Sequence, residues 1–95
     1  MFVTMVEGAV EAARESDLRS AWEDKTAVLP AGFIESALLR AEDGTWRIVT
    51  VWESREAVMA MRASGEPPAA LVMFEGAGSE PSVSMWTVEG RASAT

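Results

Sequence analysis

The side chains that could carry acid–base or metal chemistry in this chain are few. The sequence contains no histidine, cysteine, tyrosine, asparagine or glutamine. Histidine is the usual proton acceptor near neutral pH and the commonest metal ligand, and without cysteine there is neither a thiolate nor a disulfide. Any chemistry must therefore use carboxylates, arginines, Lys25, hydroxyls, indoles or backbone groups. We predict no metal site and no cofactor.

A β-hairpin is predicted to position the candidate groups. The segments 33–41 (FIESALLRA) and 45–53 (TWRIVTVWE) have the composition of strands. Asp43 and Gly44 between them fit the centre of a two-residue type I′ turn, because both residue types tolerate a positive φ. Once this turn is assumed, every cross-strand pair of the hairpin follows from it.

Glu35 is the candidate catalytic residue, as a base. The type I′ register sets it opposite Trp52 and on the same face as Phe33. A carboxyl packed against an indole in a dry pocket has its pKa raised by desolvation, and it can then accept a proton near neutral pH. The alternative is that Glu35 lies near the start of its strand and reaches solvent or Arg14.

Six further side chains are candidates for substrate binding, and five of them are apolar. They are Trp22, Phe33, Trp52, Met61, Phe74 and Arg14. Aromatic and thioether side chains can line an apolar cavity, but they also serve as ordinary core residues. Arg14 and Asp17 fall inside the apolar stripe of the first predicted helix, so they could contact a polar substrate group at a cavity mouth. A surface ion pair is the alternative for these two.

The elements that must hold these residues follow one another as strand, helix, strand, strand, helix, strand. We expect a strand over 2–6, a helix over about 8–28, the hairpin, a helix from Arg55 to about Ser64 behind the N-cap Ser54, a short helical stretch opened by Glu66-Pro67-Pro68, and a strand over 81–89. This βαββαβ order is typical of a ferredoxin-like α+β fold with a four-stranded antiparallel sheet. Residues 1–90 are predicted to form a single domain and residues 91–95 a flexible C-terminal tail.

Both faces of the predicted hairpin are substantially apolar. A hairpin with one wet face should alternate between apolar and polar residues, so each face here needs cover. Helices can cover one face, and a second subunit is the simplest cover for the other, which predicts a homodimer. The assumed register also sets Arg40 opposite Arg47, a like-charge pair that acids of the partner subunit would offset. Otherwise this pair contacts an anion or splays into water.

Charge and hydropathy limit the other partners. The formal net charge is −7, whereas proteins that bind DNA or RNA gather Lys and Arg on one face. No apolar run approaches the ~20 residues of a membrane span, and the N-terminus lacks the pattern of a signal peptide. We therefore expect a cytoplasmic protein with neither a nucleic-acid nor a membrane partner.

Two motifs give the chain a family resemblance. LPAGF at Leu29–Phe33 leads into the second strand, and VTVWESREA at Val49–Ala57 joins the third strand to its helix. Together with the order of elements, these motifs make residues 2–90 resemble the antibiotic biosynthesis monooxygenase-like (ABM) family of dimeric α+β barrels. The resemblance implies a homodimer in which two four-stranded sheets face each other. It also implies a ligand cavity in each subunit, between the sheet and the helices.

The resemblance implies binding of a small apolar or aromatic molecule. Family members include enzymes that oxidise polycyclic aromatic substrates without metal or flavin, and haem-degrading enzymes. The haem-degrading branch has a tryptophan where this chain has Met61 and a histidine ligand where it has Leu71, so haem degradation is not expected. The expected function is cofactor-independent oxygenation of an aromatic or polyketide-like molecule. Two alternatives stay open: a non-catalytic ligand-binding or scaffolding homodimer, and an isomerase or lyase of the same superfamily that uses Glu35 as base.

Overall fold

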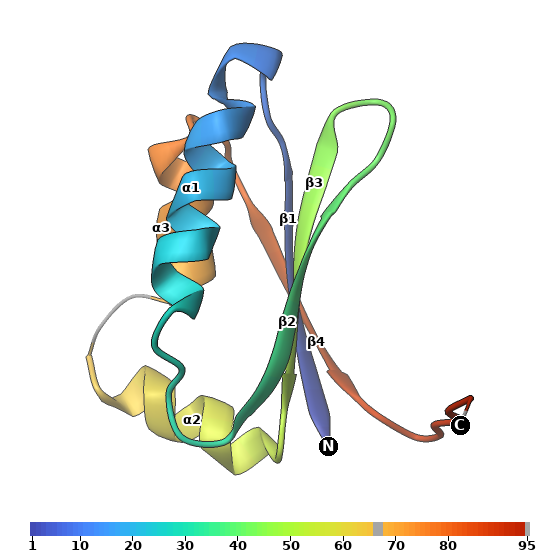
Figure 1. Cartoon of the computed structure of the whole chain (residues 1–95). Helices are drawn as coiled ribbons and strands as arrows, with labels where there is room; N and C mark the ends of the chain where they lie inside the picture. The colour runs from blue at the N-terminus through green and yellow to red at the C-terminus, as the bar shows by residue number, and fades with distance from the viewer. Residues whose placement is uncertain (66–67, 95) are drawn as a thin grey trace.

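The computed structural model describes residues 1–65 and 68–94, and it contains one antiparallel sheet with helices on one face (Figure 1). The elements are β1 (Phe2–Ala9), a short 3-10 turn η1 (Ala12–Arg14), α1 (Glu15–Thr26), β2 (Phe33–Arg40), β3 (Thr45–Trp52), α2 (Arg55–Ala63), α3 (Ala69–Gly76) and β4 (Ser82–Thr87). This order confirms the predicted βαββαβ fold with a four-stranded sheet.

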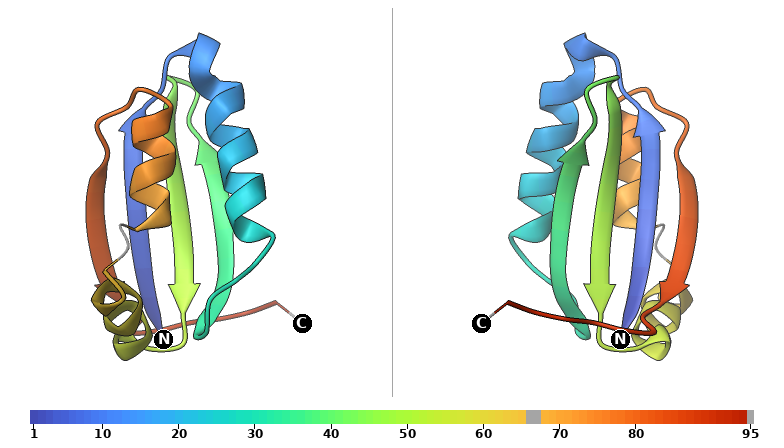
Figure 2. Two further views of the ribbon diagram at one scale, coloured as in Figure 1. Left: turned by 90° about the vertical axis from the view of Figure 1, so that its left-hand side faces the viewer. Right: turned by 90° about the vertical axis from the view of Figure 1, so that its right-hand side faces the viewer.

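The four strands lie in the order β2-β3-β1-β4, with every neighbouring pair antiparallel. Figure 2 shows α1 and α3 side by side over one face of the sheet, with α2 across one end; on the opposite face no helix covers the strands, and the C-terminal segment crosses their lower end. We call these the helix-covered face and the open face. None of the helices in the described part of the chain is long and apolar enough to cross a membrane.

The first strand is longer and the first helix shorter than the sequence pattern suggested. Residues 8–14 were expected to be helical, but β1 continues to Ala9, and α1 begins only at Glu15. The added part of β1 pairs with the start of β3, with Gly8 opposite Trp46. Backbone pairing in the sheet thus overrides the helix propensity of the alanine-rich stretch.

The hairpin register differs from the expected one by one residue. No residue other than glycine has a positive φ in the described chain, so the predicted type I′ turn at Asp43-Gly44 is wrong. The connection is a three-residue loop closed by hydrogen bonds between Ala41 and Thr45 (2.8 Å) and between Gly44 and Ala41 (3.1 Å), with Gly44 at φ +88°. A turn followed by a left-handed glycine is the usual form of a three-residue hairpin loop.

The one-residue shift exchanges the two faces of β2. Arg40 lies opposite Trp46 and Arg47 opposite Leu39, so the predicted Arg40–Arg47 pair does not exist. Each arginine instead forms its own ion pair within the chain, Arg40 with Glu15 and Arg47 with Glu7, both at 2.6 Å. No partner subunit is needed to neutralise them.

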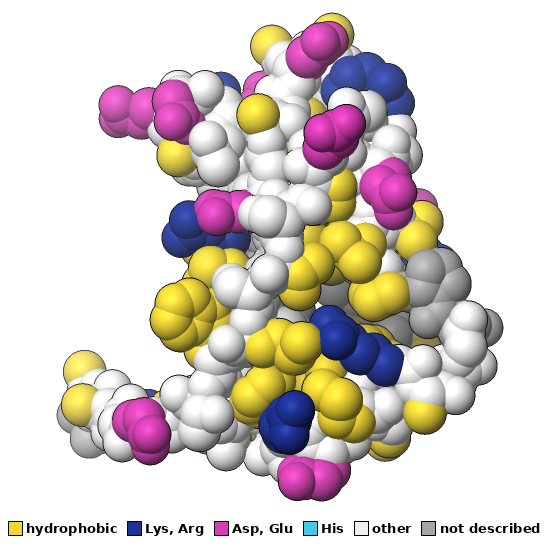
Figure 3. Space-filling view, turned by 180° about the vertical axis from the view of Figure 1, so that it is seen from behind, with side chains coloured by type: hydrophobic (Ala, Val, Ile, Leu, Met, Phe, Trp, Pro, Cys, Tyr) yellow, Lys and Arg dark blue, Asp and Glu magenta, His cyan; other side chains and the backbone are white. Residues whose placement is uncertain are grey.

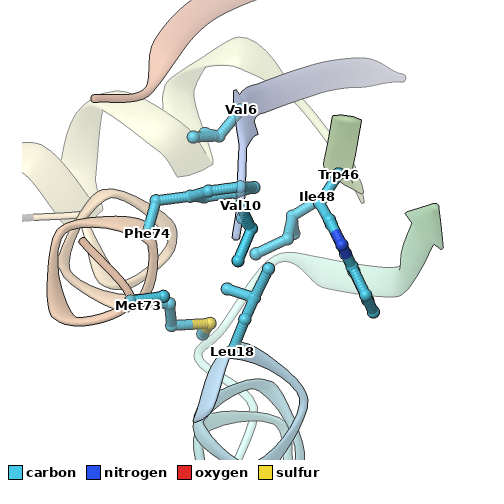
Figure 4. Packing of buried hydrophobic residues seen from close by; sticks show 8 residues of the cluster. Val6, Val10, Leu18, Trp46, Ile48, Met73 and Phe74 are labelled. Atoms are coloured by element: carbon cyan, nitrogen blue, oxygen red, sulfur yellow. The ribbon is translucent and has the colours of Figure 1, made fainter. Parts of the chain in front are cut away.

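Two clusters of buried apolar residues hold the helices to the sheet. The larger cluster lies between α1, α3 and strands β1 and β3, where Leu18 and Phe74 are completely buried and extend toward Val10 and Ile48 (Figure 4). The smaller cluster fixes α2 to the sheet through Phe2, Trp52 and Val58.

The turns around α2 and α3 largely follow the predicted signals. Ser54 caps α2 as expected, because its hydroxyl oxygen accepts a hydrogen bond from the backbone N–H of Ala57 at 3.2 Å. Gly65 follows the helix with φ +84°. The predicted opening of the next helix at Glu66-Pro67-Pro68 falls partly outside the described residues, since 66 and 67 are not among them, and α3 begins at Ala69. Residues 88–94 have no regular secondary structure.

Candidate functional site

A cavity of about 120 Å³ lies between the helix-covered face of the sheet and the helices. Figure 3 views the molecule from behind, with the helix-covered side at the right, and shows hydrophobic side chains gathered over its lower half with Lys and Arg side chains among them. An engineered cavity of about 150 Å³ in another protein takes up benzene, so this space is close to the size of one aromatic ring. Four of the predicted binding residues line it: Trp22, Phe33, Trp52 and Met61.

Two aromatic rings form one wall of the cavity. Phe33 meets Trp52 edge to face, with ring centroids 5.3 Å apart and ring planes at 67°. The pairing of β2 with β3 is interrupted between Phe33 and Glu35, so Phe33 pairs with Trp52 on the helix-covered face despite the shifted register. The indole N–H of Trp52 donates a hydrogen bond to the hydroxyl of Thr4 at 3.0 Å, which holds the ring in place.

A second polar contact fixes Trp22, which also lines the cavity. Its indole N–H donates to the hydroxyl oxygen of Ser36 at 3.1 Å, and the Thr50 hydroxyl lies 3.5 Å from the same oxygen. A serine or threonine hydroxyl has one donor and two acceptor positions. Ser36 and Thr50 can therefore also bind a polar atom of a ligand.

Sequence reasoning missed these hydroxyls, and the shifted register explains the omission. With the type I′ turn, Ser36 falls on the face opposite to Trp52. In the observed pairing Ser36 lies opposite Thr50, and both line the cavity. The signal that could have found them is the Glu42-Asp43-Gly44 tripeptide, because its glycine at the third position suits a three-residue loop.

Glu35 does not reach the cavity. It lies opposite Val51 on the open face of the sheet and is exposed, so the predicted neighbourhood of Trp52 is wrong. The pattern of the hairpin is nearly as apolar on one face as on the other, which is why the sequence did not reveal the error.

Arg14 and Phe74 also lie away from the cavity lining. Arg14 donates through Nε to Asp17 at 2.7 Å and through a terminal nitrogen to the carbonyl of Gly76 at 2.5 Å. It thus forms the ion pair considered as the alternative, and it joins the start of α1 to the end of α3. Phe74 is completely buried in the larger cluster and acts as a core residue.

A polar network surrounds the other tryptophan of β3. One carboxylate oxygen of Glu15 accepts hydrogen bonds from Nε of Arg40 at 2.6 Å and from the indole N–H of Trp46 at 2.7 Å. These two hydrogen bonds, first that from Arg40 and then that from Trp46, lower the pKa of Glu15 below its ordinary value of 4.5. The guanidinium of Arg19 lies 5.4 Å from the Trp46 ring centroid. This network is structural, since neither Glu15 nor Trp46 lines the cavity.

The rim of the cavity carries two basic side chains that were not among the predicted site residues. Lys25 comes from the last turn of α1 and Arg62 from the last turn of α2. The described residues that line the cavity include no Asp or Glu. Within residues 1–65 and 68–94, no group of three metal-ligating side chains is arranged to hold a metal ion.

The chain resembles known proteins in sequence pattern and in fold. Residues 1–70 match the family model described as antibiotic biosynthesis monooxygenase. Among curated proteins, none matches the chain.

Three solved structures illustrate the likeness of the fold. A protein from Deinococcus radiodurans assigned to the antibiotic biosynthesis monooxygenases has a TM-score of 0.73 and 11% identity, over 100% of this chain and 99% of that one. A variant of SnoaB, a cofactor-independent oxygenase from Streptomyces nogalater, has a TM-score of 0.70 and 22% identity, over 95% of each chain. A variant of MhuD with two manganese protoporphyrin IX molecules per active site has a TM-score of 0.73 and 22% identity, over 99% of this chain and 100% of that one.

Proposed function

Because this chain belongs to the antibiotic biosynthesis monooxygenase family, we propose that it binds a small aromatic molecule beside Trp52 and oxygenates it without a cofactor. The observation that supports this proposal is the apolar cavity between sheet and helices, walled by Trp22, Phe33 and Trp52. SnoaB, which shares the fold, is a cofactor-independent oxygenase. The cavity holds about one ring, so a polycyclic substrate would place one ring inside and extend the rest through the rim.

The proposed reaction needs an electron-rich substrate, since the protein supplies no redox group. A phenolic substrate with a reactive CH₂ group can reduce O₂ itself. One oxygen atom enters the substrate, the CH₂ becomes a carbonyl, and the second oxygen atom leaves as water. In this scheme the aromatic wall orients the ring and excludes bulk water. The hydroxyls of Ser36 and Thr50 hold a substrate oxygen.

Binding without turnover is the competing function, and one observation favours it. The described lining residues include hydroxyls and two basic side chains, but no carboxylate that could act as a general base. Under this alternative the chain sequesters or carries the same class of ligand.

Oxygen uptake separates the two functions. A panel of polycyclic phenols with a reactive CH₂ group would be tested in an oxygen electrode, with ¹⁸O₂ to follow the oxygen atoms. The matched variants are Ala70→Leu, which fills the cavity from α3, and Ala60→Leu, an exposed position on α2 that does not line it. We expect one ¹⁸O atom per product with the wild type and Ala60→Leu, and strongly reduced uptake with Ala70→Leu. Ligand binding without oxygen uptake would support the competing function. The absence of both binding and oxygen uptake would contradict the proposal.

A homodimer formed through the open face is part of the proposed function. Side chains on this face are mostly apolar, as the strand pairing shows for Val3, Met5, Ala37, Leu39, Val49, Val51 and Trp86. Trp86 is 56% exposed and Leu39 47% exposed in the single chain. Contiguous exposed apolar surface of this kind is typical of an interface between proteins. A second copy of the sheet has the matching shape and apolar character.

Light scattering at micromolar concentration tests the dimer. We expect the wild type to have the mass of two chains and Leu39→Glu to have the mass of one. Val28→Glu is the control, because Val28 is exposed in the loop after α1 and away from the sheet. A stable wild-type monomer would contradict the proposal.

A further inference from the structure

Lys25 and Arg62 at the rim of the cavity indicate the charge of the ligand. We propose that these two side chains recognise an anionic group, so that the ligand is an aromatic carboxylate rather than a neutral aromatic molecule. This inference rests on the proposed function, because it assumes that the ring of the ligand occupies the cavity beside Trp52.

Among the described residues, the charge at the rim is opposite in sign to that of the whole chain. The sequence has 15 acidic and 8 basic residues, yet the described residues that line the cavity include two basic side chains and no acidic one. A ligand anion approaching an acidic protein is repelled in general, and a local positive rim is what directs it to one place.

Neither basic side chain is engaged elsewhere in the described structure. The ion pairs between described residues use Arg14, Arg40 and Arg47. Over the same residues Lys25 and Arg62 make no side-chain hydrogen bond, whereas Arg14, Arg40 and Arg47 each bind a carboxylate. Both rim cations are therefore available to a ligand.

Both cations line the same cavity. Lys25 lies in the last turn of α1 and Arg62 in the last turn of α2, where the partial negative charge of the helix end favours a cation. Figure 1 shows α1 and α3 on the helix-covered side of the sheet, with α2 below them at one end of the sheet. Pro68, Ala69 and Leu71 complete the same part of the lining.

The size and the polarity of the cavity select the rest of the ligand. The cavity has about the volume of one ring, so a substituent on a ring bound there must point out toward the rim. Arginine binds a carboxylate through two parallel hydrogen bonds, and lysine adds a point charge beside it. Two cations match a single carboxylate better than a polyphosphate, which carries more charge than the rim can neutralise.

The test compares two ligands that differ only in charge. 4-Ethylbenzoate and 4-ethylbenzamide share the same ring and nearly the same shape, and ¹H–¹⁵N NMR titration of the indole N–H signals of Trp22 and Trp52 reports binding in the cavity. The variants are Lys25→Met and Arg62→Met, which keep an unbranched side chain. Arg55→Met is the control, because Arg55 is an exposed arginine of α2 that does not line the cavity.

We expect the wild type and Arg55→Met to bind the benzoate more tightly than the benzamide. Lys25→Met and Arg62→Met should each weaken benzoate binding by about two- to five-fold, the range for an exposed charge pair, and leave benzamide binding unchanged. Added salt should reduce the preference of the wild type for the benzoate over the benzamide.

Equal affinity of the wild type for both ligands would overturn the inference and leave the proposed cavity site intact. An equal loss of affinity for both ligands in the two rim variants would also overturn the inference and leave the cavity site intact, since it would show that the rim acts through packing. If neither ligand moves the two indole signals, the cavity does not take a one-ring ligand, and this inference falls together with the proposed function.

Discussion

Leu18 and Phe74 are completely buried between α1, α3 and the sheet, whereas Phe33 and Met61, toward the other end of the same sheet face, are only half-buried and line a cavity. We call these regions the filled half and the hollow half. In the filled half two helices lie side by side on the strands, so side chains from both meet over β1 and β3 (Figures 2 and 4). In the hollow half the short helix α2 crosses the end of the sheet and inserts one completely buried residue, Val58.

The two tryptophans of β3 show what this difference means for function. Trp46 and Trp52 are six residues apart on the same face of one strand, and both are buried. Trp46, in the filled half, binds Glu15 and contributes to stability alone. Trp52, in the hollow half, binds Thr4 and also presents its ring to the cavity. Residue type and strand position therefore do not distinguish a core residue from a residue that lines the cavity; the packing of the helices over each position does.

The strongest test of the comparison is the same substitution in each half. Phe74→Ala should lower the free energy of unfolding by about 3–5 kcal/mol, the usual cost of removing a buried phenylalanine, because the packed surroundings cannot collapse into the space. Phe33→Ala should cost clearly less, since its side chain is half-buried beside space that is already empty. Urea unfolding followed by circular dichroism measures both. Equal losses for the two variants would contradict the division into a filled and a hollow half.

Trp52→Phe tests how firmly the cavity wall is held. The variant keeps an aromatic ring but loses the hydrogen bond to Thr4, so we expect a loss of about 0.5–1.5 kcal/mol for that bond together with a small loss of packing. Thr4→Val removes the other partner. A double-mutant cycle from urea unfolding should show that the two substitutions are coupled; strictly additive losses would show that the indole N–H does not hold the wall.

Much of the fold could be predicted because its signals are local. Ser54 precedes α2 as an N-cap, glycines follow the helices, and the alternation of strand and helix patterns gives the βαββαβ order. The family motif VTVWESREA at Val49–Ala57 is also a feature of the local sequence. The start of α1 could not be predicted in the same way, since strand pairing with β3 decides it.

The candidate site was less predictable, because it depends on the pairing register of the hairpin and on the volume left unfilled between the sheet and the helices. One residue of difference in the hairpin loop removed Glu35 from the helix-covered face and brought Ser36 to it. Phe33 lies on its predicted face only because the pairing of β2 with β3 is interrupted between Phe33 and Glu35. No sequence signal indicated this interruption. Whether Met61 meets other side chains or an empty space depends on how three helices together fill one sheet face, which is a property of the packed fold rather than of any segment.

The ion-pair network of the filled half predicts a pH dependence of stability. The pKa of Glu15 is lower in the folded chain than its ordinary value of 4.5, because Arg40 and Trp46 bind the ionised form. This contribution is fully present above the ordinary value and is lost as the pH falls through the folded pKa. Glu15→Gln should therefore be less stable than the wild type near pH 7, and the difference should shrink progressively below pH 4.5. A gap that stays constant down to low pH would contradict the assignment; the variant keeps an acceptor oxygen, so we expect an effect smaller than that of Trp52→Phe.

Adding volume should have the smallest effect of all in the hollow half. Ala70 lines the cavity from α3, so Ala70→Leu can place its extra carbons in empty space, and leucine is a good helix former. Ala70 is half-buried and also packs against the larger cluster, so we expect a small loss of free energy of unfolding, below the ~1–3 kcal/mol that is typical of overpacking a filled core.

Ala77→Leu is the matched change in the filled half, where Ala77 is buried in the larger cluster at the end of the same helix. Extra carbons there must displace packed neighbours, which typically costs about 1–3 kcal/mol. Thermal unfolding of the two variants side by side gives the comparison directly, and ligand titration should show that only Ala70→Leu loses binding. If Ala70→Leu destabilises the chain as much as Ala77→Leu does, the space beside Trp52 is not open to a side chain, and it would not be open to a ligand ring either.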